Sequence, residues 1–476
     1  MSTTPESKPE LIPTEQLAPA EVGELDLYKK REKIYTRKIE GFFQRVRLYT
    51  GWPLLLGYFL LPWLNWHGQQ SVLFDLPARK FHILGLTLWP QDFPLLAWLL
   101  IIAAWGLFAV TVWVGRVWCG YTCPQTVWTA IFMWAEQVAE GSRNQRIKLD
   151  AAPWSLNKAL RKIAKHAMWV GFAFLTGLTF VGYFSPMREL VVKFATFDFG
   201  FWEGAWTLFF TSATYINAGW MREQVCLYMC PYARFQSVMF DKNTLTVSYD
   251  KKRGEPRGTR KKGVDPKSVG LGDCIDCEIC VQVCPTGIDI RNGLQYECIN
   301  CALCVDGCDS VMDKMGYPRG LIRYATENEL EGQPRRLVHP RLIGYSIGIA
   351  IMASLFTYTL ATRVPVGLDV LRDRNRLFRE TGEGLIENSY TLKVLNQDDT
   401  RHVYRVSISG LDGAEIVGKY SVTVDSGEVI ELPLRIHVDP QKLSDRKTDI
   451  EFAIEAIDNP KLRATSPTTF VAPVGH

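Results

Sequence analysis

Five long apolar stretches divide the chain, and each is long enough to cross a lipid bilayer. A membrane-spanning helix needs about 20 apolar residues, with some latitude for tilt and for interfacial aromatic residues. The stretches cover residues 48–66, 93–114, 163–185, 201–220 and 342–360, and Pro53 and Pro62 interrupt the first of them. This pattern predicts five transmembrane helices, four in the first half of the chain and one after a long polar insert.

Basic residues between these stretches predict the orientation of the helices, because short loops rich in Lys and Arg stay in the cytoplasm. Eight such residues lie in 29–47 and seven in 115–162, whereas 67–92 and 187–200 hold two each. The alternation predicts a cytoplasmic N-terminus and insert, and places everything after the fifth helix outside. The polar segment 1–28 is expected to be a disordered leader without a secretory signal.

Beyond residue 363 the hydrophobic period changes to two, which is typical of β-strands. Apolar and polar residues alternate along 430–438 and 450–455, and 390–395 and 403–408 are further candidate strands. About 100 residues are expected to form a small antiparallel sandwich, in which Pro433 indicates an edge strand because proline donates no ladder hydrogen bond. The segment contains no cysteine, and we interpret it as a docking module.

Composition excludes several classes of protein. With 47% apolar and 22% charged residues, the chain is neither a disordered polymer nor wholly embedded in lipid. The net charge of +4 is too balanced to indicate a nucleic-acid partner, and no nucleotide-binding or haem-attachment motif is present. The basic run KKRGEPRGTRKK at 251–262 is interpreted as a juxtamembrane linker attracted to anionic lipid.

Eight cysteines in the insert form two copies of a cluster-binding pattern, C-x2-C-x2-C-x3-C, and a proline follows the first copy. The copies are Cys274, Cys277, Cys280 and Cys284, and then Cys298, Cys301, Cys304 and Cys308. In this arrangement three thiolates hold one [4Fe–4S] cluster, and the fourth, more distant thiolate reaches the neighbouring cluster. One predicted ligand set is Cys274, Cys277, Cys280 and Cys308, and the other is Cys298, Cys301, Cys304 and Cys284.

Zinc is the structural alternative for these cysteines, since cysteine-rich pairs also bind it tetrahedrally. The doubled run is unusual for zinc, and disulfides do not suit a reducing cytoplasm. Asp309 follows Cys308 where a second proline would be expected. This departure concerns the conformation of the turn after Cys308 and not the binding of a cluster by Cys308.

The remaining four cysteines form a second repeat, C-x-Y-x-C-P, which occurs twice at the end of an apolar stretch. The motifs run from Cys119 to Pro124 and from Cys226 to Pro231. If the preceding helices continue through the motifs, cysteines four residues apart share a face, and each proline kinks or ends the helix. Paired thiolates suit a soft metal such as Cu(I), and Met229 adds a candidate thioether. The alternative is that these cysteines are small buried packing residues.

Histidine offers little chemistry in the predicted membrane region. His166 is the one histidine within a predicted span, so no facing histidine pair can hold a b-type haem there. We interpret it as a hydrogen-bonded interfacial side chain.

Together, the spans, the two C-x-Y-x-C-P motifs, the run CPTGIDIRNGLQYECINCALC at 284–304 and the terminal sandwich closely resemble the CcoG family, also called FixG or RdxA. The resemblance covers nearly the whole chain from about residue 30. It implies a bacterial cytoplasmic-membrane protein that serves assembly of cbb-type cytochrome c oxidase and reduces Cu(II) to Cu(I). It also implies that the terminal domain is immunoglobulin-like and periplasmic.

The expected organisation has five parts. They are a leader at 1–28, a four-helix transmembrane region at 29–222, a cytoplasmic ferredoxin-like domain at 223–341, a fifth transmembrane helix at 342–362 and a periplasmic immunoglobulin-like β-sandwich at 363–476. The resemblance assigns two [4Fe–4S] clusters to the eight insert cysteines and a copper-related, catalytic role to Cys119, Cys123, Cys226 and Cys230.

The working hypothesis is an electron relay in which a cytoplasmic or quinone donor fills the clusters, which then reduce copper near the paired membrane cysteines. Cu(I) would pass to a copper transporter or chaperone and to oxidase assembly factors. Two alternatives remain: a membrane ferredoxin that relays electrons to a partner reductase, with structural membrane cysteines, and a non-catalytic assembly scaffold.

Overall fold

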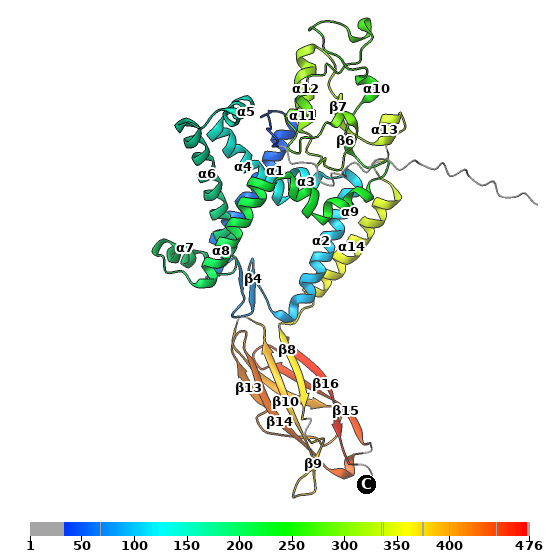
Figure 1. Cartoon of the computed structure of the whole chain (residues 1–476). Helices are drawn as coiled ribbons and strands as arrows, with labels where there is room; N and C mark the ends of the chain where they lie inside the picture. The colour runs from blue at the N-terminus through cyan, green and yellow to red at the C-terminus, as the bar shows by residue number, and fades with distance from the viewer. Residues whose placement is uncertain are drawn as a thin grey trace, which may run out of the picture.

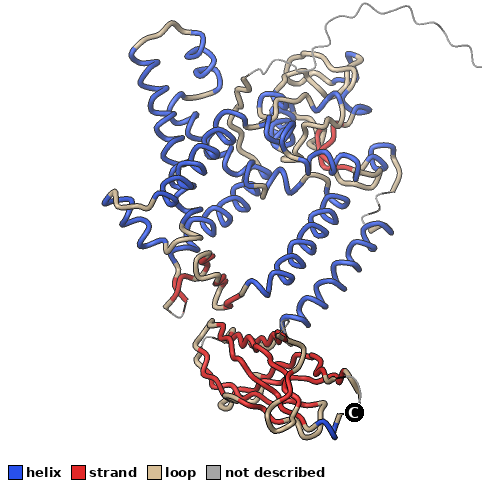
Figure 2. The backbone as a smooth tube through the Cα atoms, turned by 60° about the horizontal axis from the view of Figure 1, so that its bottom comes forward, coloured by secondary structure: helices blue, strands red, loops and turns tan. Residues whose placement is uncertain are grey.

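A computed structural model describes residues 33–473, except residues 67, 335, 337, 374, 375, 399 and 444. The predicted leader at 1–28 lies outside the described residues. The chain forms a loop-rich domain, a set of long helices and a β-sandwich, in that order along the molecule (Figure 1). The loop-rich domain and the sandwich lie at opposite ends of the helices, as the distribution of strands, helices and loops in Figure 2 also shows.

Five long helices form where the sequence predicts membrane spans. They are α1 (Phe42–Leu60), α2 (Phe93–Val114), α6 (Leu156–Val181), α8 (Phe201–Thr214) and α14 (Pro340–Ala361). Among the described residues, three of them, α2, α6 and α14, are long and apolar enough to cross a membrane. The remaining two fall short because α1 carries Arg45 and Arg47 in its first turns and α8 is 14 residues long, continuing as the π-helix η3 (Tyr215–Met221).

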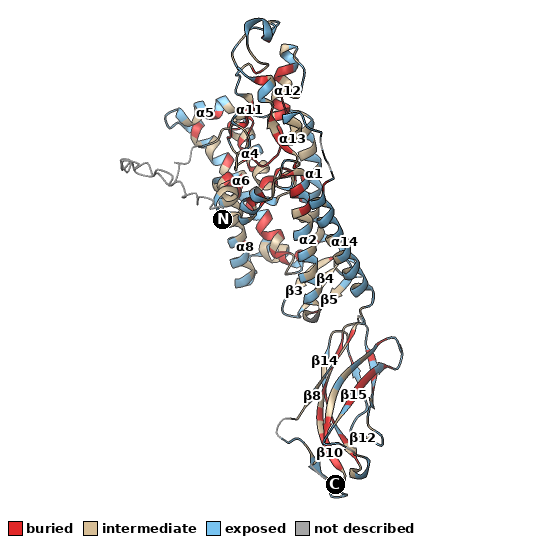
Figure 3. Ribbon diagram, turned by 90° about the vertical axis from the view of Figure 1, so that its right-hand side faces the viewer, coloured by how far each residue is buried: buried red, intermediate tan, exposed pale blue. Residues whose placement is uncertain are grey.

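The long helices form two groups. In one, α6 packs against α8 and against α4 (Pro124–Glu140), and in the other α2 packs against α14. Broad exposed faces run along α2 and α14 (Figure 3), where Leu99, Leu100, Ile347 and Ile351 contact no other part of the chain closely enough to be buried. Such apolar, exposed faces are expected where a helix contacts lipid.

Further helices, most of them short, fill segments that the hydropathy pattern predicts as loops. On the side of the loop-rich domain these are α3 (Val117–Tyr121), α5 (Arg143–Ala151), the π-helix η4 (Val225–Met229) and α9 (Pro231–Met239), in addition to α4. On the opposite side lie α7 (Met187–Thr196), the hairpin β1 (Asn65–Trp66) and β2 (Gln69–Gln70), and the sheet β3 (Val72–Asp75), β4 (Lys80–Ile83) and β5 (Leu86–Leu88).

The loop-rich domain is held together by one small antiparallel sheet and two cysteine-bearing turns. Strands β6 (Thr246–Tyr249) and β7 (Ile322–Ala325) pair with each other, and each cysteine run leads into a helix, α11 (Ile279–Gln282) or α12 (Leu303–Met315). The short helices α10 (Lys251–Gly254) and α13 (Glu327–Glu331) flank the sheet. Its buried core consists of apolar side chains and cysteines together, so the cysteines are part of the packing.

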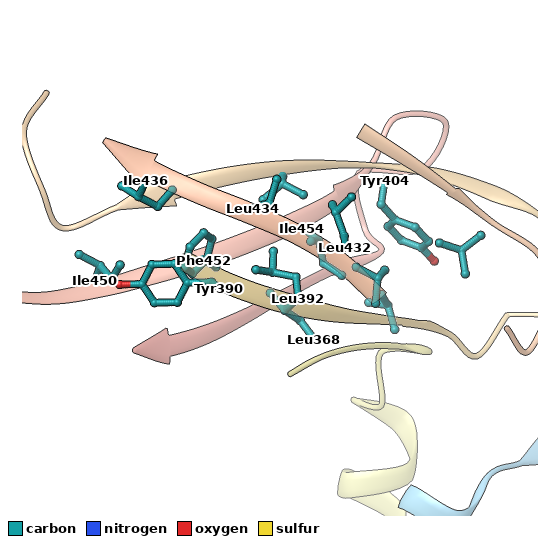
Figure 4. Packing of buried hydrophobic residues seen from close by; sticks show 14 of the residues in the cluster. Leu368, Tyr390, Leu392, Tyr404, Leu432, Leu434, Ile436, Ile450, Phe452 and Ile454 are labelled. Atoms are coloured by element: carbon teal, nitrogen blue, oxygen red, sulfur yellow. The ribbon is translucent and has the colours of Figure 1, made fainter. Parts of the chain in front are cut away.

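The C-terminal domain is a sandwich of two antiparallel sheets. One sheet has the order β12 (Glu415–Val417), β14 (Val429–Val438), β10 (Ile386–Asn396) and β8 (Val366–Arg372), with β9 (Arg379–Glu380) beside β10. The other has the order β13 (Ser421–Val424), β11 (His402–Ser409), β15 (Lys447–Ala456) and β16 (Arg463–Val471). Figure 4 shows their inward residues, among them Tyr390, Leu434, Phe452 and Ile454, interdigitating in the core.

The period-two pattern therefore predicts the four central strands correctly, but the inference from Pro433 is wrong. Strand β14 lies between β12 and β10 and is not an edge strand. Pairing with β12 ends at Val417 opposite Arg435, so Pro433 lies just beyond the part of β14 that β12 covers. Because β12 does not pair with β14 at Pro433, the missing N–H of Pro433 removes no hydrogen bond between these two strands. An interior strand can therefore contain this proline.

Candidate metal centres

The eight insert cysteines line two small cavities in the loop-rich domain. Cys274, Cys277, Cys280 and Cys308 line the first, which we call the distal cavity. Cys284, Cys298, Cys301 and Cys304 line the second, which we call the proximal cavity and to which Cys280 also contributes. Each cavity is lined by one of the two ligand sets that the spacing predicts. In each set three cysteines come from one run, and the fourth, Cys308 or Cys284, comes from the other run.

The two cysteine runs share an unusual backbone conformation. Asp276 and Glu278 in the first run, and Asn300 and Ala302 at the equivalent positions of the second, all have φ between 54° and 56°. Side chains other than glycine rarely adopt this left-handed region. In this conformation the backbone amides of Asn300 and Val281 lie close enough to Cys298 and Cys280 to favour their thiolate forms.

The donor set fits two [4Fe–4S] clusters better than zinc. All twelve cysteines are free, and in the described part of the chain no three Cys, His, Asp or Glu side chains converge on a point where one ion could bind. Zinc requires such convergence, whereas each thiolate of a cubane binds a different iron. Burial raises the pKa of Cys280 and Cys298 to about 12, so these thiols must lose protons when they bind iron.

The two C-x-Y-x-C-P motifs adopt matching local structures, but no span continues through them as a helix. Gly115, with a φ of +55°, ends α2 four residues before Cys119, and α3 is a separate helix. Each second cysteine, Cys123 or Cys230, immediately precedes a proline that begins a new helix, α4 or α9. Each also donates its N–H to the carbonyl five residues earlier, at 2.9 Å and 2.8 Å. Proline therefore starts a helix here, where its missing N–H has no partner to lose.

The four motif cysteines gather in one place, which we call the four-thiol site. Cys119 interacts electrostatically with the other three thiols, and the pairs among Cys123, Cys226 and Cys230 also interact. Each of the four is partly exposed. The described residues contain no three ligating side chains at single-ion distances, so the thiols are neighbours without forming a closed coordination sphere. Met229, the candidate thioether, is 57% exposed on η4.

Buried polar residues that the sequence pattern does not reveal support the four-thiol site. Gln236 on α9 is fully buried, and its Oε1 accepts a hydrogen bond from the Cys119 Sγ at 3.4 Å. Its Nε2 donates to the Thr111 Oγ1 at 3.2 Å, and that hydroxyl lies 2.6 Å from the Tyr232 Oη. A glutamine within a short helix carries no motif, so only the packing of α9 against α2 identifies it.

The four-thiol site lies directly against the proximal cavity. Gly120 packs on the cysteine run so closely that a Cβ there would lie 2.7 Å from the Ile299 carbonyl oxygen and 2.9 Å from the Cys301 Cα. Cys119 packs into the same apolar cluster as Cys301 and Leu303. One thiol of the motif and one wall of the proximal cavity are therefore part of a single packed unit.

Arg116 joins both motifs to the cluster-binding loop. Its guanidinium is buried, donates to the carbonyls of Tyr296 and Cys298, and donates at 2.7 Å to the carbonyl of Ala233 on α9. Tyr324 adds a second link, because its hydroxyl lies 3.3 Å from the Tyr121 hydroxyl and donates to the Asn300 carbonyl. These contacts fix the orientation of the loop-rich domain relative to the motifs.

His166 takes no part in these centres. Its Nδ1 lies 2.8 Å from the Tyr215 hydroxyl, so the side chain is hydrogen-bonded, as we interpreted it.

Two family models match the chain. Residues 221–327 match one described as "4Fe-4S dicluster domain", and residues 356–473 match one described as "IG-like fold at C-terminal of FixG, putative oxidoreductase". The first match covers both cysteine-lined cavities, and the second covers the sandwich.

Two known proteins are similar to this chain over most of its length. The chain is 38% identical over 460 residues to the "Nitrogen fixation protein FixG" of Rhizobium meliloti, covering 88% of this chain and 86% of that one. It is 40% identical over 403 residues to "Protein RdxA" of Cereibacter sphaeroides, covering 81% and 84%. A crystal structure of a FixG-related protein from Vibrio parahaemolyticus matches 23% of this chain and 98% of its own, at 35% identity and a TM-score of 0.22.

The cavities, the sandwich and the extent of these matches agree with one another. This chain belongs to the FixG/RdxA family, as a membrane protein with a 4Fe–4S dicluster domain, a C-terminal IG-like domain and the character of an iron–sulfur oxidoreductase.

Proposed function

We propose that this protein reduces Cu(II) to Cu(I) at the four-thiol site, with electrons that arrive through the loop-rich domain. The observation that carries the proposal is the contact of the Cys119 motif with the wall of the proximal cavity at Gly120 and Cys301. When bound there, the clusters supply single electrons at low potential. Each electron that reaches the four-thiol site converts one Cu(II) substrate ion to Cu(I).

The chain's own residues supply binding and selectivity in this reaction. Cysteine thiolates are soft ligands that favour Cu(I) over harder cations, so the product is stabilised more than the substrate. Two thiols alone could reduce two Cu(II) ions only once, because the thiols themselves would be oxidised to a disulfide. A supply of electrons from the neighbouring cavities makes the reaction repeatable. Gln236 and Arg116 position the Cys119 motif for this contact.

We further propose that all five long helices cross the bacterial cytoplasmic membrane. The two that fall short of a full apolar span, α1 and α8, would cross it with the help of their flanking turns. Successive long helices run in alternating directions (Figure 1), which supports placing the start of α1 and the loop-rich domain on one side of the membrane and the sandwich on the other. The Lys and Arg residues of 29–47 and 115–162 favour the cytoplasm for the first side and the periplasm for the second. Cu(I) would pass to a copper transporter or chaperone that serves assembly of cbb-type oxidase.

Double substitution C226A/C230A tests the copper site. Full-length protein is purified without oxygen, and Cu(II) reduction is followed with a Cu(I)-specific chelator under steady supply of a chemical reductant. We expect the variant to lose at least tenfold in rate, about 1.4 kcal/mol or more in barrier, while its iron and sulfide content stays that of wild type.

The variant L227A, which truncates a side chain in the same turn of η4 and keeps both thiols and Met229, is the matched control and should reduce copper normally. An unchanged rate in C226A/C230A would favour the second candidate, a membrane ferredoxin with structural cysteines. That candidate is supported by one observation, the absence among the described residues of three side chains arranged around a single ion.

A further inference from the structure

The basic run at 251–262, which we call the basic segment, lies beside the distal cavity. It holds seven Lys and Arg residues and one carboxylate, Glu255. The Gly258 N–H donates to the Cys274 carbonyl at 3.2 Å, and the Arg260 Nη1 lies 3.5 Å from the same oxygen. Arg260 also donates to the Tyr317 hydroxyl at 2.9 Å. The run is thus built into the fold around a cluster-binding loop.

This position adds a contact that the interpretation of the run as a juxtamembrane linker does not include. The first C-x-Y-x-C-P motif contacts the proximal cavity, where Gly120 meets Ile299 and Cys301, whereas the basic segment contacts the distal one, at Cys274. In Figure 1, α10 at the start of the segment lies farther from α2 and α14 than β6 and β7 do. The charge of the segment therefore lies beside the distal cavity, on the side of the loop-rich domain away from α2 and α14.

The distal cavity is the part of the eight-cysteine core that reaches the surface. Cys277 is exposed, whereas the other seven insert cysteines are buried or partly buried. Arg291 lines the same cavity and pairs with Asp276 at 2.5 Å and with Asp289 at 2.7 Å. Arg257 of the basic segment also acts on Asp289 electrostatically. Two arginines therefore lie close to the exposed edge, and Arg291 pairs with Asp276 next to Cys277, while Glu278 on the other side of Cys277 forms no ion pair among the described residues.

Four lysines of the basic segment add charge that nothing nearby cancels. Lys251, Lys252, Lys261 and Lys262 are exposed, and no carboxylate of the described residues forms an ion pair with them. The seven basic residues and the single Glu255 leave the segment with a net charge of +6. An exposed redox edge beside such a patch attracts a negatively charged protein and increases its rate of encounter.

We propose that the basic segment and the Cys277 edge form the docking surface for an acidic, soluble protein that carries one electron at a time. The carrier is oxidised by one electron, the chain is reduced by one electron at the distal cavity, and no bond forms or breaks. The inference rests on the proposed function in one respect, that the protein needs an external supply of electrons. The donor that fits this surface is a ferredoxin-like protein and not a quinol within the lipid.

Charge reversal at two exposed lysines, K261E/K262E, tests this surface. The probe is a reduced, strongly acidic plant-type [2Fe–2S] ferredoxin, mixed in stopped flow with the full-length, cluster-loaded protein in nanodiscs of neutral lipid, and bleaching of the cluster absorbance is recorded. We expect the second-order rate to fall about tenfold at low ionic strength, and the two proteins to converge at high salt, where charges are screened. Binding of the oxidised ferredoxin, measured by calorimetry, should weaken in parallel.

The control variant K419E/K461E makes the same charge change at exposed lysines of the sandwich, and its rate should equal that of wild type. Photoreduced deazaflavin, a small neutral donor, should reduce all three proteins equally, which separates a docking defect from loss of the clusters. Equal ferredoxin rates for wild type and K261E/K262E would overturn the proposal. So would a difference confined to nanodiscs of anionic lipid, which would assign the segment to the membrane surface. Neither outcome depends on whether the protein reduces copper.

Discussion

Gly120 shows how much one residue determines at the junction of the two kinds of centre. It lies inside the first C-x-Y-x-C-P motif, and the backbone of Ile299 and Cys301 fills the space where its side chain would be. The Gly120 carbonyl, freed by the break before Pro124, accepts a hydrogen bond from the Arg47 Nε at 3.1 Å. A small residue is therefore required where the motif meets the proximal cavity.

Substitution G120A should separate the motif from the cavity wall. The added methyl would meet main-chain atoms that cannot rotate away, so we expect a loss of stability of about 1–3 kcal/mol, measured by thermal unfolding of the full-length protein with cluster absorbance as the signal. The matched control is G106A in α2, where no atom lies within 4 Å of the new Cβ. That substitution should be neutral or slightly stabilising, since alanine favours helix. A G120A protein as stable as G106A would contradict the contact.

Residue-level features divide into those that the sequence could predict and those that it could not. The grouping of the eight insert cysteines into two sets follows from spacing, because cluster chemistry requires cysteines at fixed separations. The roles of Gln236 and Arg116 cannot be predicted in this way, because nothing in the local sequence distinguishes them from other polar residues. Their contacts form only when α2, α9 and the cluster-binding loop pack together. The left-handed φ of Ala302 is equally hidden, because alanine normally avoids it.

At the scale of elements, periodicity predicts strands better than it predicts the helices near the motifs. The sandwich strands alternate cleanly because one face of each packs into a single core. The helices α3, α4 and α9 lie in segments whose apolar content is too low for a span, and their boundaries depend on Gly115 and on prolines that begin helices. Tertiary contacts with α6 and with the loop-rich domain determine them, so hydropathy alone predicts loops.

One element of the sandwich is expected to respond to pH. His402, at the start of β11, is buried; its Nδ1 lies 2.6 Å from Asp458 and its Nε2 lies 2.8 Å from Asp398 and 2.9 Å from the Thr400 hydroxyl. Burial alone would lower the pKa of His402, but the hydrogen bonds to the two carboxylates outweigh it and raise the pKa above 6.5. A raised pKa means that the protonated side chain stabilises the fold.

The stabilisation by His402 should be complete below about pH 6.5 and be lost as the pH rises through the raised pKa. Hydrogen exchange of sandwich peptides, measured by mass spectrometry on the full-length protein, compares wild type with H402Q at each pH. The protection that wild type has over H402Q should be largest in acid and shrink towards alkaline pH. A difference that grew with pH would show that the neutral imidazole is the stabilising form.

At the scale of the whole molecule, the order of the parts supports a single direction of electron flow. The basic segment borders the distal cavity, the proximal cavity adjoins it through Cys280, and the four-thiol site packs on the proximal cavity. The helices then lead towards the sandwich, where Arg363 at the end of α14 pairs with Asp92 at 2.6 Å. The sequence predicts these parts, but not that the two thiol motifs converge, because they are 107 residues apart.

Single-turnover oxidation of the pre-reduced protein by Cu(II) tests whether electrons stored in the loop-rich domain reach copper at the four-thiol site. Anaerobic full-length protein, reduced and freed of excess reductant, is titrated with Cu(II) while cluster absorbance and a Cu(I)-specific chelator are read in one cuvette. The account predicts that absorbance recovers as Cu(I) appears, one Cu(I) for each electron stored, and that C226A/C230A retains its electrons under the same conditions. Clusters that stay reduced in wild type, or Cu(I) formed equally fast by the variant, would contradict it.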